Sequence, residues 1–246
     1  MTGELDFSGK TVLVTGGSSG IGNGVAHAFR ARGATVHVTG TRAVAADYLG
    51  EQGSNLEGLH YWQLDVGQAQ DIASKAPDLP ALDILVMSQG KVLYRRREFD
   101  QEGWDEVIAI NLNSLMHLAR RYKPALAANK GAIVIVSSLS GFMSNIGNPA
   151  YAASKAGAVS LTKTLGEAWA ADGIRVNGIA PGFVETKLTA VTFSDPVRRE
   201  QTLGRIPLAR LGTADEMAGA IMFLASPLSS YVVGQTLIVD GGLGLS

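Results

Sequence analysis

The 246-residue sequence predicts an α/β fold in which a doubly wound parallel sheet of about seven strands carries helices on both faces. Short apolar runs alternate with helical patterns from one end of the chain to the other, and this alternation is typical of parallel strands joined by helices. Several of the runs are continuously apolar, which is the pattern of strands that are buried on both faces.

Seven segments are predicted to be strands, namely 10–15, 35–39, 59–66, 82–88, 131–138, 174–180 and 235–240. The helical patterns lie near 20–32, 100–128, 149–171 and 213–225. The connection from 66 to 81 leaves room for a helix of only a few turns. No repeat, low-complexity tract or linker divides the chain, so we expect residues 1–246 to form a single domain. The least regular stretch, 183–212, is the expected substrate-binding loop region, because long irregular segments are often lids.

Composition narrows the classes of function. With 21 Lys+Arg and 22 Asp+Glu, the formal net charge is −1. The charge of the whole protein therefore gives no reason to expect binding to nucleic acid or to an anionic membrane. The absence of cysteine excludes disulfides, thiolate catalysis and cysteine-based metal sites, and we expect no metal. The polar start MTGELDFSGK is unlike a secretory signal, and no apolar run approaches the roughly 18 residues that span a bilayer. We expect a soluble, cytoplasmic protein.

A glycine-rich turn leads from the first predicted strand directly into the first helix, over residues 15–22 with the sequence TGGSSGIG. Gly16 permits the sharp turn, Gly20 permits backbone to approach a phosphate, and Gly22 permits close helix–strand packing. The helix N-terminus offers N–H groups and partial positive charge to a pyrophosphate. A tight turn without a ligand is the alternative, but the strand before it and the helix after it favour a dinucleotide site.

A tyrosine and a lysine four residues apart, Tyr151 and Lys155, open a later helical pattern. They share one helix face, so the phenol and the ammonium can reach the same site. A phenol with a pKa of about 10 is a poor acid–base catalyst near neutrality, and a nearby ammonium would lower that pKa. Ser138 ends the apolar run IVIVSS, at the edge where ligands gather in parallel sheets. Alone, each of these features has an ordinary structural explanation, a surface pair for Tyr151 and Lys155 and a turn residue for Ser138.

Asn111 lies in the apolar helix pattern that begins near Trp104. Asparagine is unfavourable inside a helix, so we expect its side chain to make a functional polar interaction, with helix bending or packing as the alternative. Asn113 is a weaker candidate, because it lies off the same face.

These motifs together resemble the short-chain dehydrogenase/reductase family, whose members have a Rossmann fold. The glycine turn has the family's spacing T-G-x-x-x-G-x-G, and Ser138 stands thirteen residues before Tyr151, as the family's catalytic serine does. The closing Val239-Asp240-Gly241-Gly242 resembles the family's last strand, so that the resemblance spans residues 8 to 242.

The resemblance implies an NAD(P)-dependent oxidoreductase that transfers a hydride between nicotinamide and a carbonyl or secondary alcohol. Tyr151 would give or take the proton, Ser138 would hold the substrate oxygen, and Lys155 would tune Tyr151 and grip the nicotinamide ribose. Asn111 would bind a water that completes the relay. The resemblance also places Asp65 at the adenine, Val184 at the nicotinamide carboxamide, and Thr186 at the carboxamide or the pyrophosphate. The predicted cofactor contacts are Gly16, Ser18, Ser19, Gly20, Ile21, Gly22, Thr41, Arg42, Asp65, Val66, Gly90, Tyr151, Lys155, Pro181, Gly182, Val184 and Thr186.

One departure from the family concerns the segment after the fourth strand. The family usually has Asn-Asn-Ala-Gly there, and this chain has Met87-Ser88-Gln89-Gly90. Backbone approach to the cofactor needs mainly Gly90, whereas the asparagine side chains that pin the neighbouring backbone are missing. We therefore expect a local loss of stability, or a compensation elsewhere, without loss of the chemistry.

The choice of cofactor depends on the end of the second strand. A carboxylate there would bind the ribose hydroxyls of NAD, but the position is Gly40, and Arg42 can offer a fork to the extra phosphate of NADP. Ser19 stands where many NADP-preferring relatives have arginine, and Arg42 can also be a solvated loop residue. The sequence favours NADP, with NAD as the alternative.

The substrate stays open at this point. Arg95-Arg96-Arg97 could attract an anionic substrate, or could form a solvated or subunit-contact loop. The chain loosely resembles the sugar-acid dehydrogenases of the family and, comparably, its 3-oxoacyl thioester reductases. A non-catalytic nucleotide sensor or interaction protein is the competing class, although such proteins often lose the Tyr or the Lys that this chain retains. The family also implies a homotetramer, with contacts from the apolar faces of 100–128 and 149–171.

Overall fold

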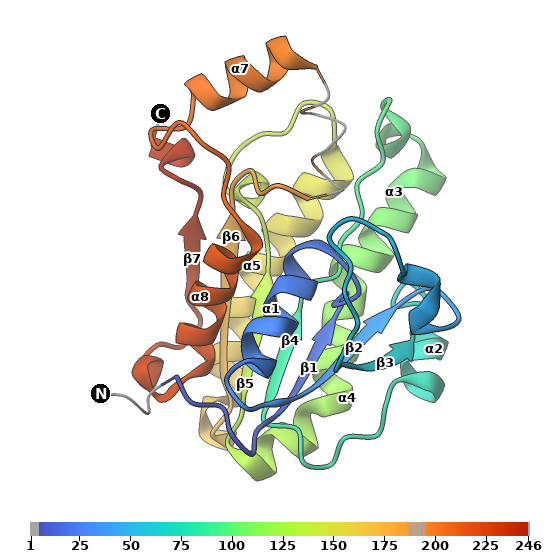
Figure 1. The fold of residues 1–246 in the computed structure, drawn as a ribbon, viewed down its shortest axis with the longest axis vertical. Helices are drawn as coiled ribbons and strands as arrows, with labels where there is room; N and C mark the ends of the chain where they lie inside the picture. The colour runs from blue at the N-terminus through green and yellow to red at the C-terminus, as the bar shows by residue number, and fades with distance from the viewer. Residues whose placement is uncertain (1–4, 187–188, 190–192, 194, 246) are drawn as a thin grey trace.

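The computed structural model describes residues 5–186, 189, 193 and 195–245, and its strands form one parallel sheet in the order β3-β2-β1-β4-β5-β6-β7 (Figure 1). The order of the strands reverses between β1 and β4, which is where open α/β sheets bind ligands. The prediction of a doubly wound sheet of about seven strands is confirmed, and every strand overlaps a predicted segment. The strands are β1 (Thr11–Thr15), β2 (Thr35–Gly40), β3 (His60–Gln63), β4 (Ile84–Met87), β5 (Ala132–Val136), β6 (Arg175–Pro181) and β7 (Thr236–Val239).

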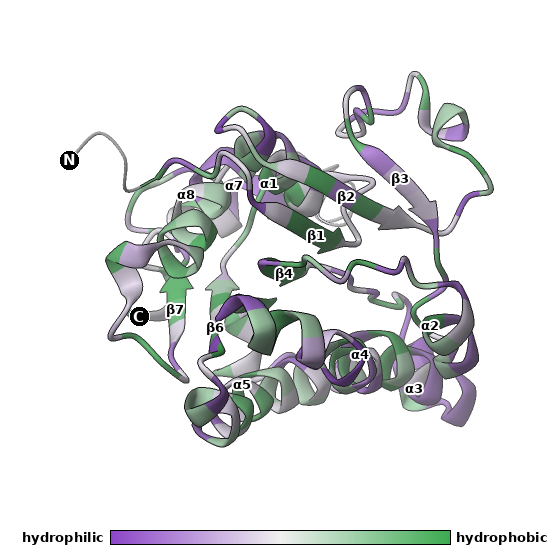
Figure 2. Ribbon diagram, turned by 90° about the horizontal axis from the view of Figure 1, so that it is seen from below, coloured by the Kyte–Doolittle hydropathy of each residue, from purple (hydrophilic) through white to green (hydrophobic). Residues whose placement is uncertain are grey.

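Helices cover both faces of the sheet, and Figure 2 shows one layer of them above the strands and the other below. One layer contains α1 (Gly20–Arg30) and α8 (Ala214–Ala225), and the other contains α2 (Ala69–Lys75), α4 (Ser114–Asn129) and α5 (Pro149–Trp169). Successive side chains of β1 enter different cores, because Val12 and Val14 pack with α1 and α8 whereas Leu13 packs with α4 and α5. Burial on both faces is therefore the reason why β4 and β5 are continuously apolar, whereas the edge strands β3 and β7 are partly exposed.

The single helix predicted near 100–128 is divided into two. It consists of α3 (Gln101–Ile108), a π-helical turn (Ala109–Asn113) and α4, which begins at Ser114. The Ser114 hydroxyl donates to the carbonyl of Ile110 over 2.6 Å, inside this turn. A π turn inserts one residue without breaking the apolar pattern, and such turns are frequent at functional sites.

The stretch 183–212 is more regular than the sequence predicted, because it contains α7 (Pro196–Gly204). The carboxylate of Asp195 accepts the N–H groups of Val197 and Arg198 and caps this helix. The expectation of an irregular segment is wrong for this part. Residues 187–188, 190–192 and 194 of the stretch lie outside the described residues.

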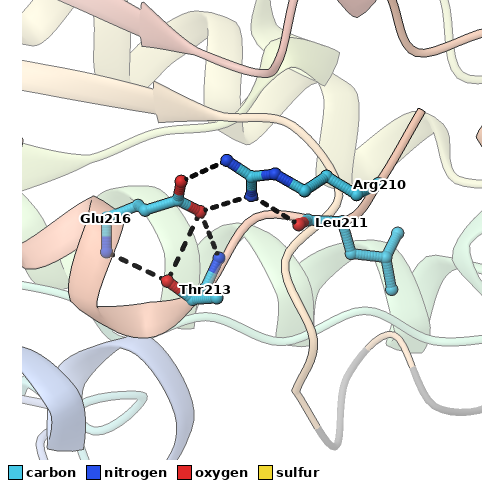
Figure 3. A network of polar contacts seen from close by, with 4 residues as sticks. All are labelled: Arg210, Leu211, Thr213 and Glu216. Atoms are coloured by element: carbon cyan, nitrogen blue, oxygen red, sulfur yellow. Dashed lines mark hydrogen bonds and ion pairs between the residues drawn. The ribbon is translucent and has the colours of Figure 1, made fainter. Parts of the chain in front are cut away.

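Polar contacts fix the segment that joins α7 to α8 (Figure 3). Arg210 binds both carboxylate oxygens of Glu216, over 2.9 and 2.6 Å, and Glu216 also forms a capping box with Thr213 at the start of α8. Between them, Gly212 forms an isolated bridge with Val184. The network thus anchors the backbone that holds Val184, a predicted cofactor contact.

None of the helices within the described ranges is long and apolar enough to cross a membrane.

Candidate active site

A cavity of about 610 Å³ lies at the carboxyl edge of the sheet, where β1, β4, β5 and β6 end. All the predicted cofactor contacts except Arg42 line it, and so do three of the four predicted catalytic residues. Those that line it are Gly16, Ser18, Ser19, Gly20, Ile21, Gly22, Thr41, Asp65, Val66, Gly90, Ser138, Tyr151, Lys155, Pro181, Gly182, Val184 and Thr186.

The glycine turn leaves no room for side chains at two positions. Gly16 has a φ of +70°, and a Cβ atom there would lie 2.7 Å from the Cα of Gln89. A Cβ atom on Gly22 would overlap the carbonyl of Gly16, so helix α1 can begin this close to β1 only with glycine. Gly20 has a φ of +57° and faces Thr186 across the cavity. The turn therefore leaves backbone open toward the cavity, as the phosphate-site hypothesis requires.

Lys155 is buried on the first turns of α5, next to Tyr151. Its ammonium donates to the carbonyl of Val136 over 2.9 Å and lies 5.6 Å from the centroid of the Tyr151 ring. Burial lowers the pKa of Lys155 to about 8. Gly90 faces the Lys155 ammonium, because a Cβ atom on Gly90 would lie 3.6 Å from it.

Desolvation is the largest influence on Tyr151, and it raises the pKa of the phenol above its ordinary value. The hydrogen bond with Ser138 lowers that pKa, while the nearby Tyr94 and Glu98 raise it further. The expectation that Lys155 brings the pKa of Tyr151 down is wrong for this structure. The physical reason is that the phenol is removed from water while the ammonium is directed to a strand carbonyl.

Asn111 does not line the cavity, and its side chain is occupied by backbone. Its Oδ1 accepts the N–H of Lys91 over 2.8 Å, and its Nδ2 donates to the carbonyl of Lys91 over 2.9 Å and to the Ser154 hydroxyl over 3.2 Å. Asn111 thus ties the π turn to the segment after β4 and to α5. Its predicted role in holding a water stays a prediction.

Gln89 provides the compensation that the departure from Asn-Asn-Ala-Gly called for. The side chain is buried, its Oε1 accepts from the Thr15 hydroxyl over 2.6 Å, and its Nε2 donates to the Ser114 hydroxyl over 2.9 Å. The end of β1 and the start of α4 are therefore joined through one amide. The sequence contained a signal for this. Glutamine stands at the family's alanine position in a buried segment, where its amide must find hydrogen-bond partners.

Arg42 lies beside the cavity and is engaged by its own loop. Its guanidinium binds the carboxylate of Glu51 and the carbonyl of Asp47, and it lies 4.7 Å from the centroid of the Tyr48 ring. Tyr48 is buried, and its hydroxyl interacts with Ser18 of the glycine turn. Sequence reasoning missed Tyr48 and Glu51, because neither belongs to a motif.

Residues 16–244 match the family model described as Enoyl-(Acyl carrier protein) reductase. The chain belongs to the short-chain dehydrogenase/reductase family. It is 40% identical to the 2-dehydro-3-deoxy-D-gluconate 5-dehydrogenase of Bacillus subtilis, over 97% of this chain and 96% of that protein. It is 38% identical to a 3-oxoacyl-(acyl-carrier-protein) reductase of Salmonella typhimurium, over 97% and 99%.

Among solved structures, a gluconate 5-dehydrogenase from Burkholderia cenocepacia, in complex with NADP and tartrate, superposes with a TM-score of 0.88. It is 28% identical and covers 99% of this chain and 98% of its own. The predictions of family, fold class and enzyme class are confirmed. This short-chain dehydrogenase/reductase is an NAD(P)-dependent oxidoreductase acting on a CH–OH or keto group.

Proposed function

We propose that this oxidoreductase interconverts a keto and a hydroxyl group of a sugar acid, with NADP(H) as cofactor and Tyr151 as the proton-transferring residue. One observation carries the choice of substrate class. The consecutive arginines Arg95, Arg96 and Arg97 are exposed on a loop whose neighbours reach Tyr151, since Glu98 accepts the N–H of Tyr151 over 2.9 Å. A cationic loop at this place suits a substrate with a carboxylate.

The residues present fit a dinucleotide. The glycine turn presents backbone and the N-terminus of α1 to the cavity, and Gly90 leaves open space beside the Lys155 ammonium. A bound nicotinamide would supply or accept the hydride. In this proposal Lys155 would bind the nicotinamide ribose, Val184 the carboxamide, and Thr186 the carboxamide or the pyrophosphate. Asp65 accepts from the adenine.

The chain's own residues would move the proton. Ser138 holds the substrate oxygen by donating a hydrogen bond, and Tyr151 gives its proton to that oxygen in reduction or takes it back in oxidation. A raised pKa keeps Tyr151 protonated before reduction, which suits the role of proton donor. Asn111 positions Lys91 and the π turn beside these groups and, by family resemblance, the water that completes the relay.

The preference for NADP is supported by the end of β2, where Gly40 and Thr41 line the cavity and neither carries a carboxylate that would repel a phosphate. Arg42 is the proposed phosphate-binding group, which requires its guanidinium to leave Glu51. The Burkholderia relative with bound NADP supports the same choice.

The test is a turnover assay with purified protein, NADPH and NADH, on a panel of keto sugar acids, matched neutral keto sugars and a 3-oxoacyl thioester. We expect turnover of a keto sugar acid and much weaker turnover of its neutral counterpart. Turnover of the thioester alone would refute the sugar-acid proposal and favour the activity that the Salmonella relative's name states. Absence of turnover with every carbonyl compound would contradict the enzyme class itself and favour the hypothesis of a non-catalytic nucleotide sensor.

We also propose that the protein is a cytoplasmic homotetramer built through the apolar faces of 100–128 and 149–171. Light scattering after gel filtration tests the assembly. A monomer in solution would refute it.

A further inference from the structure

A carboxylate is completely buried in the loop between β4 and α3. Glu98 has 0% of its surface exposed. Its Oε1 accepts from the backbone N–H of Leu93 over 2.9 Å and from the Nδ2 of Asn148 over 3.0 Å, and its Oε2 accepts from the backbone N–H of Tyr151 over 2.9 Å. Within the described part of the chain, no Lys or Arg nitrogen forms an ion pair with it. A buried charge held only by neutral donors needs an explanation.

The first part of the explanation is the start of α5. Tyr151 lies in the first turn of this helix, where backbone N–H groups have no acceptor within the helix. Glu98 supplies that acceptor, and the positive end of the helix dipole stabilises its charge. Asn148, the residue directly before α5, is held by the same carboxylate. Glu98 therefore caps the helix that carries Tyr151, although it is 53 residues away in sequence.

The second part is the shape of the arginine loop. Leu93 is fixed at both backbone groups, because its N–H donates to Glu98 and its carbonyl accepts from Asn148 over 2.9 Å. Between Leu93 and Glu98, Arg95 and Arg96 have φ values of 59° and 60°. Two consecutive left-handed residues that are not glycine are strained, and such strain persists only where the surroundings impose it. The contacts of Glu98 lie directly after this strained pair and reach back to Leu93 before it, and the arginine side chains are exposed.

We propose that Glu98 is a positioning residue that fixes Tyr151 and the arginine loop to each other and places a carboxylate at the N-terminus of the helix that carries the phenol. The inference rests on the proposed role of Tyr151. Among the described residues, the charged or titratable groups around the phenol are Lys155 on its own helix and Tyr94 and Glu98 from the loop. Ser138 contacts the phenol from the segment after β5. Across the cavity, Lys91 and Glu106 pair with each other. The Glu98 charge disfavours the phenolate and so favours the proton-donating form of Tyr151.

The test compares pH profiles of kcat/KM for three variants. Glu98→Gln keeps the shape of the side chain and removes its charge. Asn148→Ala keeps the charge and removes one contact of the carboxylate. Glu102→Gln removes an exposed carboxylate from the first turn of α3 and is the matched control.

For Glu98→Gln we expect the limb of the profile that reports Tyr151 to move to lower pH, by on the order of one unit. The direction follows because loss of a neighbouring negative charge stabilises the phenolate. For Asn148→Ala we expect kcat to fall severalfold with the limb in place, and for Glu102→Gln no change. An unmoved limb in folded Glu98→Gln would overturn the proposal, because a purely structural role changes the active fraction and not the pH profile.

If Glu98→Gln gives no folded protein, the kcat of Glu98→Asp tests the positioning role instead. It retains the charge but withdraws the carboxylate from the Tyr151 N–H by one methylene, so kcat should fall at least severalfold. An unchanged kcat in that variant would refute the positioning role. Retained turnover in Tyr151→Phe would instead refute the proposed function, so the two failures are distinguishable.

Discussion

Replacing Gln89 by alanine should destabilise the protein, even though alanine is the family's usual residue at this position. The substitution removes the acceptor of the Thr15 hydroxyl and the donor to the Ser114 hydroxyl. Thr15 retains only a long contact of 3.4 Å to the carbonyl of Val86, whereas Ser114 retains its bond to Ile110. Two buried hydrogen bonds at about 1 kcal/mol each, with a small cavity, give a loss of about 2–3 kcal/mol in the free energy of unfolding.

Such a loss corresponds to a Tm lower by roughly 5–10 °C for a chain of this length. Thermal and urea unfolding monitored by circular dichroism would measure it, with Gln70→Ala on the exposed face of α2 as the control. Gln89→Met retains much of the volume without the amide and separates packing from hydrogen bonding. A loss below about 0.5 kcal/mol in Gln89→Ala would refute the claim that the amide replaces the missing asparagines.

Three further predictions concern the site. Tyr151→Phe should lose nearly all turnover, by at least about 100-fold, while nicotinamide fluorescence shows cofactor binding retained. Arg42→Ala should lower the NADPH-to-NADH affinity ratio by roughly tenfold, and Glu51→Gln should raise it by freeing the guanidinium; unchanged ratios in both variants would exclude a phosphate site there. The affinity for NADPH should fall as the pH rises through about 8, where Lys155 loses its charge, and Lys155→Met should abolish that dependence.

The burial of Lys155 also predicts a trend in stability. Its pKa is about 8 in the folded state and near 10.5 in the unfolded chain. Between these values the unfolded state binds more protons, so the contribution of Lys155 to the free energy of unfolding rises from pH 8 to 10.5 and is absent below pH 8.

The fold was predictable because its signals are local. Continuous apolar runs mark strands that are buried on both faces, and the glycine turn is needed where β1 meets α1 at close range. The same locality explains the errors. The π turn at Ala109–Asn113 adds one residue without interrupting the apolar pattern, so a single helix was predicted. The start of α7 was missed, although Asp195 caps this helix directly before Pro196.

Most of the candidate site was predictable because motifs fix residues at known spacings, and Ser138, Tyr151 and Lys155 line one cavity together with the glycine turn. The residues that hold those groups in place were missed for a physical reason. Gln89 and Glu98 act on partners 74 and 53 residues away, and neither distance has a period or a motif in the sequence.

The burial of Gln89 and Glu98 nevertheless has the same structural consequence. A polar side chain is stable in a dry interior only when every donor or acceptor it presents is satisfied, so each such residue fixes the segments that satisfy it. Gln89 joins the glycine turn's strand to the start of α4, and Glu98 joins the arginine loop to α5. Tyr151 is thus held by Glu98, and the strand that leads into the glycine turn by Gln89, two residues that lie outside the predicted motifs. Changes of substrate within such a fold can therefore arise from the loop that Glu98 holds, without altering Tyr151 or Lys155.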